Sequence, residues 1–464
     1  MVAERWVWLR LTLLGVVAGF LAGGVVLLFR TLVEIGQIWL LGLGTLGHYE
    51  GQQPWFRLIL PVATGLALGL AFDRLPAGMR QVGVTHVLSH LQARGRKRLP
   101  PKNMLTQFFG AVVAIVGGHS VDREGPAVHL GAASASLLGR GQRTGAQQDT
   151  TLAACGAAAA IAAAFGTPLA GVIFVVEVLG VRYEVGRILP VIVAAVVGAV
   201  VGSLTSRFFS LAEPGFAVAP ENLASNWELP TLVLLGFAIA ALALAFIALS
   251  ERIAQRTQRW RCTLVFPLAG LVTGLLALWR PEVMGTSYDT LGWLLLGEGD
   301  LLLVVSLALA KLLASGVAVG LRVPGGLIGP TLFIGGAAGS ALGMALAFLS
   351  PSEPASPAFY ATIGMVAMMG ATLRAPLAAL TALLELTANP NIILPGMIAV
   401  ASAELITRLV HGKASIFDVL LAVQTRALAD AHRRGGAPPP AAANAGGELG
   451  LGATRQRRDT DQFY

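Results

Sequence analysis

The residues GHSVDREGP, numbers 118–126, place four ionisable side chains between two apolar runs of the chain. Pro126 predicts a helix start, because proline is favoured in the first turn of a helix. The free N–H groups at such a start carry partial positive charge and attract anions. Charge is costly among apolar helices, so this loop is a candidate functional site. Glu124 would place its own carboxylate where an anion binds, and would leave that position when protonated or displaced.

The composition is that of a membrane protein. Of the 464 residues, 55% are hydrophobic and 12% charged, and the mean hydropathy is +0.71. Several apolar runs approach the roughly 20 residues that a helix needs to cross a bilayer, and they include residues 11–29, 229–249 and 301–319. Others fall short, as in helices that end inside a membrane and line a cavity, namely residues 58–72, 104–118 and 361–373. We therefore expect an all-α polytopic membrane protein with broken and tilted helices.

Basic and acidic residues are concentrated in different connections between the apolar runs. The basic set lies in residues 94–102, 252–261 and the tail from Arg433, and the acidic set in residues 213–228, 282–300 and Glu353. By the positive-inside rule, the basic connections and both termini are expected to be cytoplasmic. The net charge of +8 does not indicate nucleic-acid binding, because no basic stretch is interleaved with aromatic residues on a soluble domain.

An internal repeat divides the chain into two halves. The tripeptide PLA, followed by a glutamate nine residues after its proline, occurs at residues 168–177 and again at 376–385. A Gly-Pro pair precedes each copy; the pairs are 204 residues apart and the PLA elements 208 apart. We interpret residues 1–430 as one transmembrane domain of two inverted halves, about 1–212 and 213–430. Chance similarity between low-complexity helices is the alternative. Residues 431–464 are expected to be a disordered cytoplasmic tail.

A second glycine-rich element, VPGGLIGP at residues 323–330, matches the first stretch in the other half. Its glycines let the backbone turn sharply and expose N–H groups, and a helix is expected to follow. Two helix starts that meet near the middle of the membrane would form an anion site without a basic side chain. For either element alone, a tight helix junction is the alternative interpretation.

These motifs resemble those of the CLC family of chloride channels and anion/proton exchangers, and the resemblance extends over about residues 10–430. DREGP at 122–126 is similar to the family's GREGP, and PGGLIGP at 324–330 to its PGGxFxP. Residues 156–171 and SIF at 415–417 are similar to two further motifs. The resemblance implies a CLC-like inverted repeat, a homodimer in the lipid bilayer, one anion pore per subunit, and Glu124 as its gate. It also suggests an atypical prokaryotic member without cytoplasmic regulatory domains.

The resemblance also implies a set of anion-binding positions, which are Val82, Gly83, Arg123, Glu124, Gly125, Leu327, Ile328 and Phe417. Val82 stands where the family has a serine, and Phe417 where it has a tyrosine. Both hydroxyls that coordinate the central anion are therefore lost, and the backbone N–H groups of Leu327 and Ile328 remain. Each lost hydrogen bond to a charged group weakens binding by about 1.5–3 kcal/mol. Weak binding suits fast transport, or anions such as nitrate or bicarbonate.

Three further residues are candidate modifiers of selectivity. Thr85 lies one turn beyond Val82 and can partly replace the lost hydroxyl. Asp122 replaces the motif glycine, and either pairs with Arg123 or repels anions at the pore mouth. Arg322 adds a positive charge before the second element, or is an interface arginine.

The proton path of the family's exchangers is altered in this chain. Those exchangers relay protons through a second glutamate, whose position is Val178 here. Glu177, beside it, is expected to cap or brace helices rather than carry protons. We therefore expect a passive, pH-gated channel for chloride and other small inorganic anions, with an anion/proton exchanger as the alternative.

Two other classes of protein are conceivable from the same residues. His119, Asp122, Glu124 and His129 suggest a metal site and a membrane enzyme, but they lack the spacing of a known metal motif. A cation transporter would use Glu124 as a ligand, but the adjacent helix start would repel a cation. We therefore expect no enzymatic activity, no metal and no cofactor.

Overall fold

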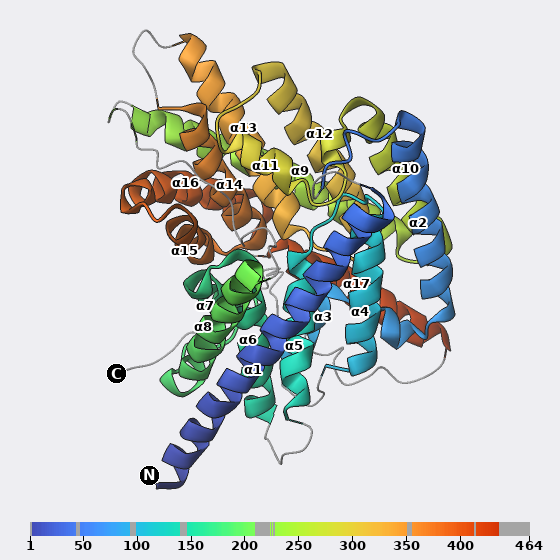
Figure 1. Ribbon diagram of the computed structural model, residues 1–464, viewed down its shortest axis with the longest axis vertical. Coiled ribbons are helices and arrows are strands. Elements are labelled where there is room, and N and C mark those ends of the chain that lie inside the picture. The colour runs from blue at the N-terminus through green and yellow to red at the C-terminus, as the bar shows by residue number, and fades with distance from the viewer. Residues whose placement is uncertain are drawn as a thin grey trace, which may run out of the picture.

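The computed structural model describes residues 2–42, 47–92, 99–139, 146–208, 223, 225, 228–349, 355–412 and 414–435. These residues form a bundle of helices that run at many angles to one another, with α1 (Val2–Ile35) crossing its length (Figure 1). Within the described residues, eight helices are long and apolar enough to cross a membrane, by length and composition. The expected all-α polytopic architecture is confirmed.

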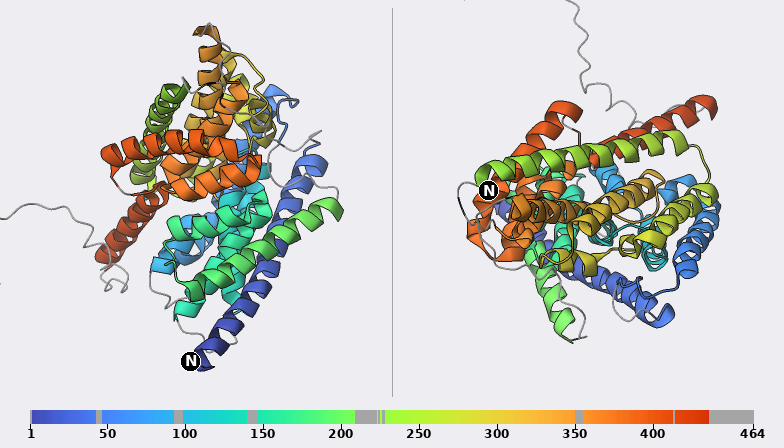
Figure 2. Two further views of the ribbon diagram at one scale, coloured as in Figure 1. Left: turned by 90° about the vertical axis from the view of Figure 1, so that its left-hand side faces the viewer. Right: turned by 90° about the horizontal axis from the view of Figure 1, so that it is seen from above.

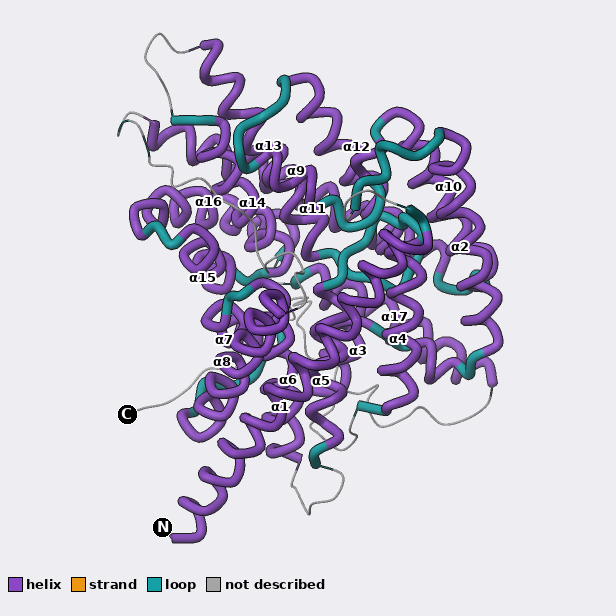
Figure 3. The backbone as a smooth tube through the Cα atoms, viewed as in Figure 1, coloured by secondary structure: helices purple, strands orange, loops and turns teal. Residues whose placement is uncertain are grey.

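The first half of the chain contains a series of helices of very different lengths. After α1 they are η1 (Gly36–Leu40), α2 (Pro54–Arg74), η2 (Ala77–Arg80), α3 (Gly83–Gln92), α4 (Pro101–Val116), α5 (Glu124–Leu137), α6 (Ala146–Phe165), α7 (Pro168–Glu177) and α8 (Val185–Phe208). The helix expected to start at Pro126 begins two residues earlier, at Glu124. The short helix α5 begins inside the bundle, and Figure 3 shows loop segments in the interior.

The second half contains helices of the same kinds. They are α9 (Leu229–Thr257), α10 (Cys262–Trp279), η4 (Pro281–Val283), α11 (Tyr288–Leu294), α12 (Leu301–Gly320), α13 (Ile328–Leu349), α14 (Pro357–Leu373), α15 (Pro376–Thr387), η5 (Pro390–Ile392), α16 (Ile393–His411) and α17 (Ile416–Gly435). The two views of Figure 2 show α17 extending away from the main body of the bundle.

Three sequence expectations need correction or fall outside the described residues. The run 58–72 was expected to be short, but α2 has 21 residues, because residues 54–57 and 73–74 at its two ends also join the helix. The tail was expected from residue 431, but α17 continues to Gly435, because residues 431–434 favour helix and the first glycine pair follows them. The half boundary near residue 212 and residues 436–464 lie outside the described residues.

Small residues allow equivalent helix pairs in the two halves to pack closely. α5 packs against α6, and α13 against α14. Gly131 faces the backbone of Gly156 in the first pair, and Gly335 faces the backbone of Gly364 in the second, with no room for a Cβ at either contact. Close packing through small residues replaces the hydrophobic driving force that is missing between helices in lipid. The contacts thus follow the sequence repeat.

The two PLA elements contact each other through reciprocal helix caps. The Glu177 carboxylate accepts hydrogen bonds from Leu377 N at 3.1 Å and Ala378 N at 2.8 Å. Glu385 accepts from Leu169 N and Ala170 N, both at 2.8 Å. Each carboxylate therefore satisfies free N–H groups at the start of the other helix, and α7 lies beside α15 (Figure 1). The expected capping role of Glu177 is confirmed.

Candidate anion-binding site

The two glycine-rich elements meet in the middle of the bundle. Asp122 and Gly326 form an antiparallel bridge: Asp122 N donates to Gly326 O at 3.2 Å, and Gly326 N donates to Asp122 O at 3.1 Å. The bridge places the start of α5 directly beside the start of α13, from the other half of the chain. Free N–H groups of both helices therefore point into one region, which favours negative charge.

Asp122 supplies negative charge at this junction. Its Oδ1 accepts from Gly125 N at 3.0 Å, and its Oδ2 accepts from Gly329 N at 2.5 Å. The side chain has no exposed surface. We had expected Asp122 either to pair with Arg123 or to repel anions; instead it binds the first turns of both helices, because the bridge to Gly326 turns its side chain toward them.

Glu124 lies beside this junction and has other partners. Its Oε2 accepts from the Tyr288 hydroxyl, and its Oε1 lies 3.2 Å from Arg123 Nε. The Arg123 guanidinium also lies 5.1 Å from the centre of the Tyr288 ring. We had expected the Glu124 carboxylate at the helix start; that position is taken by Asp122, and Glu124 is drawn to a donor from α11. The side chain is 1% exposed.

Lys311 holds the segment that carries Tyr288. Its Nζ donates to Val283 O at 3.1 Å, Gly285 O at 3.0 Å and the Ser287 hydroxyl at 2.6 Å. The residue is fully buried on α12, with the ammonium 5.4 Å from the centre of the Phe333 ring. Lys311 and Tyr288 were not among the residues predicted from the sequence, because neither belongs to a motif. The signal that could have indicated Lys311 is a lysine inside a long apolar run.

A cavity of about 350 Å³ leads up to the junction of the two helix starts. Predicted anion-binding residues that line it are Val82, Gly83, Gly125, Leu327 and Phe417, and the predicted modifiers Thr85 and Arg322 also line it. The wall contains no serine or tyrosine hydroxyl at positions 82 and 417, as the sequence requires. Residues widely separated in the sequence therefore surround one space that ends at the first turns of α5 and α13.

The other candidate residues lie away from this cavity. Ile328 lines a smaller apolar cavity of about 40 Å³. Arg123 and Glu124 lie on the α11 side of the junction. Val178, the lost proton-relay position, is buried in an apolar cluster.

Two of the predicted modifiers bond to backbone carbonyls. Arg322 donates to Gln258 O at 3.1 Å and Thr257 O at 2.9 Å at the end of α9, so it is an interface arginine that also borders the cavity. The Thr85 hydroxyl donates to Val82 O at 3.4 Å.

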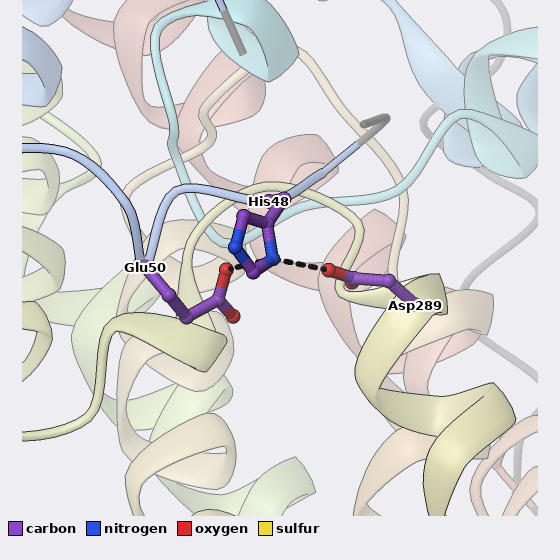
Figure 4. A group of neighbouring side chains, drawn as sticks. All are labelled: His48, Glu50 and Asp289. Atoms are coloured by element: carbon purple, nitrogen blue, oxygen red, sulfur yellow. Dashed lines mark ion pairs between the residues drawn. The ribbon is translucent and has the colours of Figure 1, made fainter. Parts of the chain in front are cut away.

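A titratable group lies on the α11 side, outside the membrane-spanning helices. His48 Nδ1 lies 3.0 Å from Glu50 Oε2 and 3.9 Å from Asp289 Oδ2 (Figure 4). Their ligand atoms lie within 4.8 Å of one another, so the group has the geometry to hold a cation. Burial, and then the nearby charge of Asp289, raises the pKa of Glu50 to about 7. Asp289 directly follows Tyr288, so this group adjoins the Glu124 contact.

Glu50→Gln is expected to stabilise the protein at high pH and to have no such effect at low pH. The raised pKa means that folding favours the protonated carboxyl, so native stability falls as pH rises from the ordinary value of 4.5 to about 7. Glu50→Gln has no carboxyl group at this position, so its stability should not fall over this pH range. Thermal unfolding in detergent across that range measures the difference. Asp289→Asn should flatten the native pH dependence as well; equal pH profiles in all three proteins would contradict the assignment.

The four residues that suggested a metal site do not come together as ligands in the described part of the chain. Asp122 and Glu124 are bonded as above. His129 Nε2 instead lies 2.8 Å from His86 Nδ1, in the interior. The four residues therefore give no support to a membrane metalloenzyme.

Comparison with known proteins identifies the family. The family model "Voltage gated chloride channel" matches residues 64–408. A ClcB-like chloride channel protein of Ralstonia nicotianae is 30% identical over 381 residues, which are 80% of this chain and 87% of that protein. The chain therefore belongs to the CLC family of chloride channels and transporters, and is a multi-pass membrane protein.

Relatives of both transport types are similar to this chain. The H(+)/Cl(−) exchange transporter ClcA of Cronobacter sakazakii is 30% identical over 337 residues, 71% of each chain. The crystal structure of a slow cyanobacterial Cl−/H+ antiporter matches with a TM-score of 0.77 and 22% identity, covering 89% of this chain and 97% of that one. The fold is thus that of CLC transporters.

Proposed function

We propose that this protein is a passive, pH-gated anion channel for chloride and other small inorganic anions, with Glu124 as its gate. The observation that carries the proposal is the cavity of about 350 Å³ that ends at the two helix starts. Backbone N–H groups there bind anions without a basic side chain, so an anion can bind and leave quickly. In this proposal the protein is a homodimer in the inner membrane of a prokaryote.

The distribution of charge supports a direction for this pathway. The cavity is lined by Ala254 and Gln258 at the end of α9, where Arg252, Arg256, Arg259 and Arg261 also lie. The helix α10 begins directly after these arginines, and its other end leads to Glu282 and Asp289, which lie near Glu50. By the positive-inside rule, the cavity opens toward the cytoplasm, and Glu124 faces the acidic outer side. Cytoplasmic termini follow from the same rule.

Two features of α7 support passive conduction over proton exchange. Val178 is packed among apolar side chains and has no ionisable group. Both carboxylate oxygens of Glu177 are held by the start of α15. A proton that crossed this region by side-chain relay would need an ionisable group there, because an isolated charge in the bilayer interior is too costly.

Anion efflux from proteoliposomes tests the proposal. Vesicles loaded with potassium chloride should release chloride only when valinomycin lets potassium leave, because the protein carries the anion alone. Vesicles without protein, and vesicles loaded with a bulky organic anion, are the controls. Potassium release without valinomycin would indicate a cation transporter. If no chloride is released even with valinomycin, the protein is not a chloride channel.

Val82→Ser and Phe417→Tyr are expected to strengthen chloride binding. Each variant restores a hydroxyl to the cavity wall, and each hydrogen bond to an anion contributes about 1.5–3 kcal/mol, or roughly tenfold or more in affinity. Isothermal titration of chloride measures the change in each variant and in the double variant. Val423→Ser, at another cavity position, is the matched control. A native protein that already binds chloride tightly and rejects nitrate would contradict this prediction.

An anion/proton exchanger is the second candidate, and one pair of side chains favours it. His86 on α3 and His129 on α5 are buried in the interior, with 2.8 Å between Nδ1 and Nε2. The ring of His90 lies 4.5 Å from that of His86. Neutral histidines in contact can pass a proton. If the protein is an exchanger, His129→Phe should abolish proton movement while anion movement remains. If it is a channel, the native protein and the variant should both move anions without protons.

A further inference from the structure

Asp122 joins helices from the two halves through one carboxylate. Its two oxygens bind Gly125 N at 3.0 Å and Gly329 N at 2.5 Å, in the first turns of α5 and α13. The side chain is fully buried. An ordinary capping residue satisfies the start of one helix. Asp122 instead places a carboxyl group where two helix starts converge, a position that attracts a free anion.

Three glycines lie so close to this carboxylate that none of them has room for a Cβ. A Cβ on Gly326 would collide with Asp122 Oδ1. A Cβ on Gly329 would lie 2.8 Å from Asp122 Cβ, and one on Gly125 would lie 2.6 Å from Gly326 Cα. Three glycines therefore leave a narrow space for a group with two oxygens, and while Asp122 fills it, both amides are taken.

The same space borders the cavity of the proposed pathway. Gly125 and Gly326 line that cavity together with Val82, Leu327 and Phe417. An anion that enters the cavity therefore approaches N–H groups that the Asp122 side chain already holds. It must displace a carboxylate, or bind more weakly in front of it.

We propose that Asp122 is a tethered competitor for the anion site, and that the ions best suited to displace it are planar oxyanions such as nitrate and bicarbonate. The proposal rests on the anion transport proposed above. Nitrate and bicarbonate present two oxygens on one atom, as a carboxylate does, and can accept from both amides at once. Chloride offers a single centre and cannot reproduce two separate oxygen positions. The residue at position 122 thereby limits flux and sets the order of anion preference.

Anion rescue of an Asp122 variant tests this directly. The full-length Asp122→Gly protein is purified in detergent, and its thermal unfolding is measured in nitrate, bicarbonate, chloride and gluconate. Gluconate, too large for the site, should leave the variant less stable than the native protein. Nitrate and bicarbonate should restore much of the loss, chloride less, and the native protein should show little difference between these anions.

Asp73 provides a matched control. Its carboxylate also accepts hydrogen bonds from two backbone N–H groups, those of Cys262 and Thr263, at 3.0 Å each. These two residues belong to one helix, so Asp73 caps only the start of α10. Asp73→Gly should therefore lose stability without rescue by nitrate. If Asp122→Gly is too unstable to purify, Asp122→Asn keeps one acceptor oxygen and should show the same anion order. Equal anion responses at positions 122 and 73, or none at 122, would overturn the proposal.

Flux measurements give a second readout. Asp122→Gly in proteoliposomes should move nitrate several-fold faster than the native protein, because the anion no longer has to displace a carboxylate that is held by two N–H groups. A folded variant with native flux would count against the proposal. Nitrate rescue of stability in a protein whose native form carries no anion would instead reject only the proposed transport.

Discussion

Glu124→Gln is expected to conduct anions rapidly at every pH, with the pH response of the native protein lost. In the native protein, flux should rise on acidification, because a neutral side chain at position 124 no longer blocks the anion. The Glu124 carboxylate is buried between the Tyr288 hydroxyl and Arg123, and in the proposed function its charge repels an incoming anion. Glutamine keeps an oxygen for Tyr288 and removes that charge. Chloride efflux from proteoliposomes between about pH 5 and pH 8 measures both profiles.

Tyr288→Phe is the matched control for Glu124. It removes the hydroxyl that donates to Glu124 and leaves the carboxylate in place. This variant should therefore keep a pH response, although the profile can move along the pH axis. A Glu124→Gln protein whose flux follows the native pH profile would remove Glu124 from the gating role.

Lys311→Met is expected to cause the largest loss of stability among single substitutions near the site. Its ammonium donates to Val283 O, Gly285 O and the Ser287 hydroxyl, all in the interior. Each buried acceptor left without a donor costs about 1–3 kcal/mol. The loosened segment leads into Tyr288, so the contact with Glu124 should weaken as well. We expect a clearly lower melting temperature in detergent and an altered pH response of chloride flux.

Ser306→Ala on the same helix is the control for Lys311. The Ser306 hydroxyl donates to Leu303 O at 2.6 Å, within α12, and that carbonyl can still accept a backbone hydrogen bond when the hydroxyl is removed. The melting temperature of this variant should stay close to that of the native protein. Equal stability of Lys311→Met and Ser306→Ala would show that the Lys311 hydrogen bonds contribute little.

The helix starts and the cavity wall could be predicted from the sequence, because local rules govern them. Gly-Pro pairs mark the beginnings of α5 and α13. The motif positions at Val82, Leu327 and Phe417, which the resemblance to the CLC family indicated, line one cavity. The reciprocal glutamates at 177 and 385 were visible as a repeat, although their contact with each other's helix was not.

The side-chain partners inside the site could not be predicted, because they depend on packing between distant segments. Asp122 and Glu124 are two residues apart, and only the bridge to Gly326 determines which carboxylate reaches the amides. Tyr288 comes from a short helix outside the motifs. Lys311 lies in a run that reads as an ordinary membrane span, and its three acceptors are more than 20 residues away in the chain.

The reversal potential in a pH gradient tests passive conduction most directly. The protein is placed in a planar bilayer with fixed, unequal chloride concentrations and without bicarbonate, and the pH of one side is then changed. A channel should reverse at the Nernst potential of chloride at every pH gradient, although the size of the current changes through Glu124. A reversal potential that moves with the proton gradient would mean that anion and proton movement are coupled, and the protein would then be an exchanger.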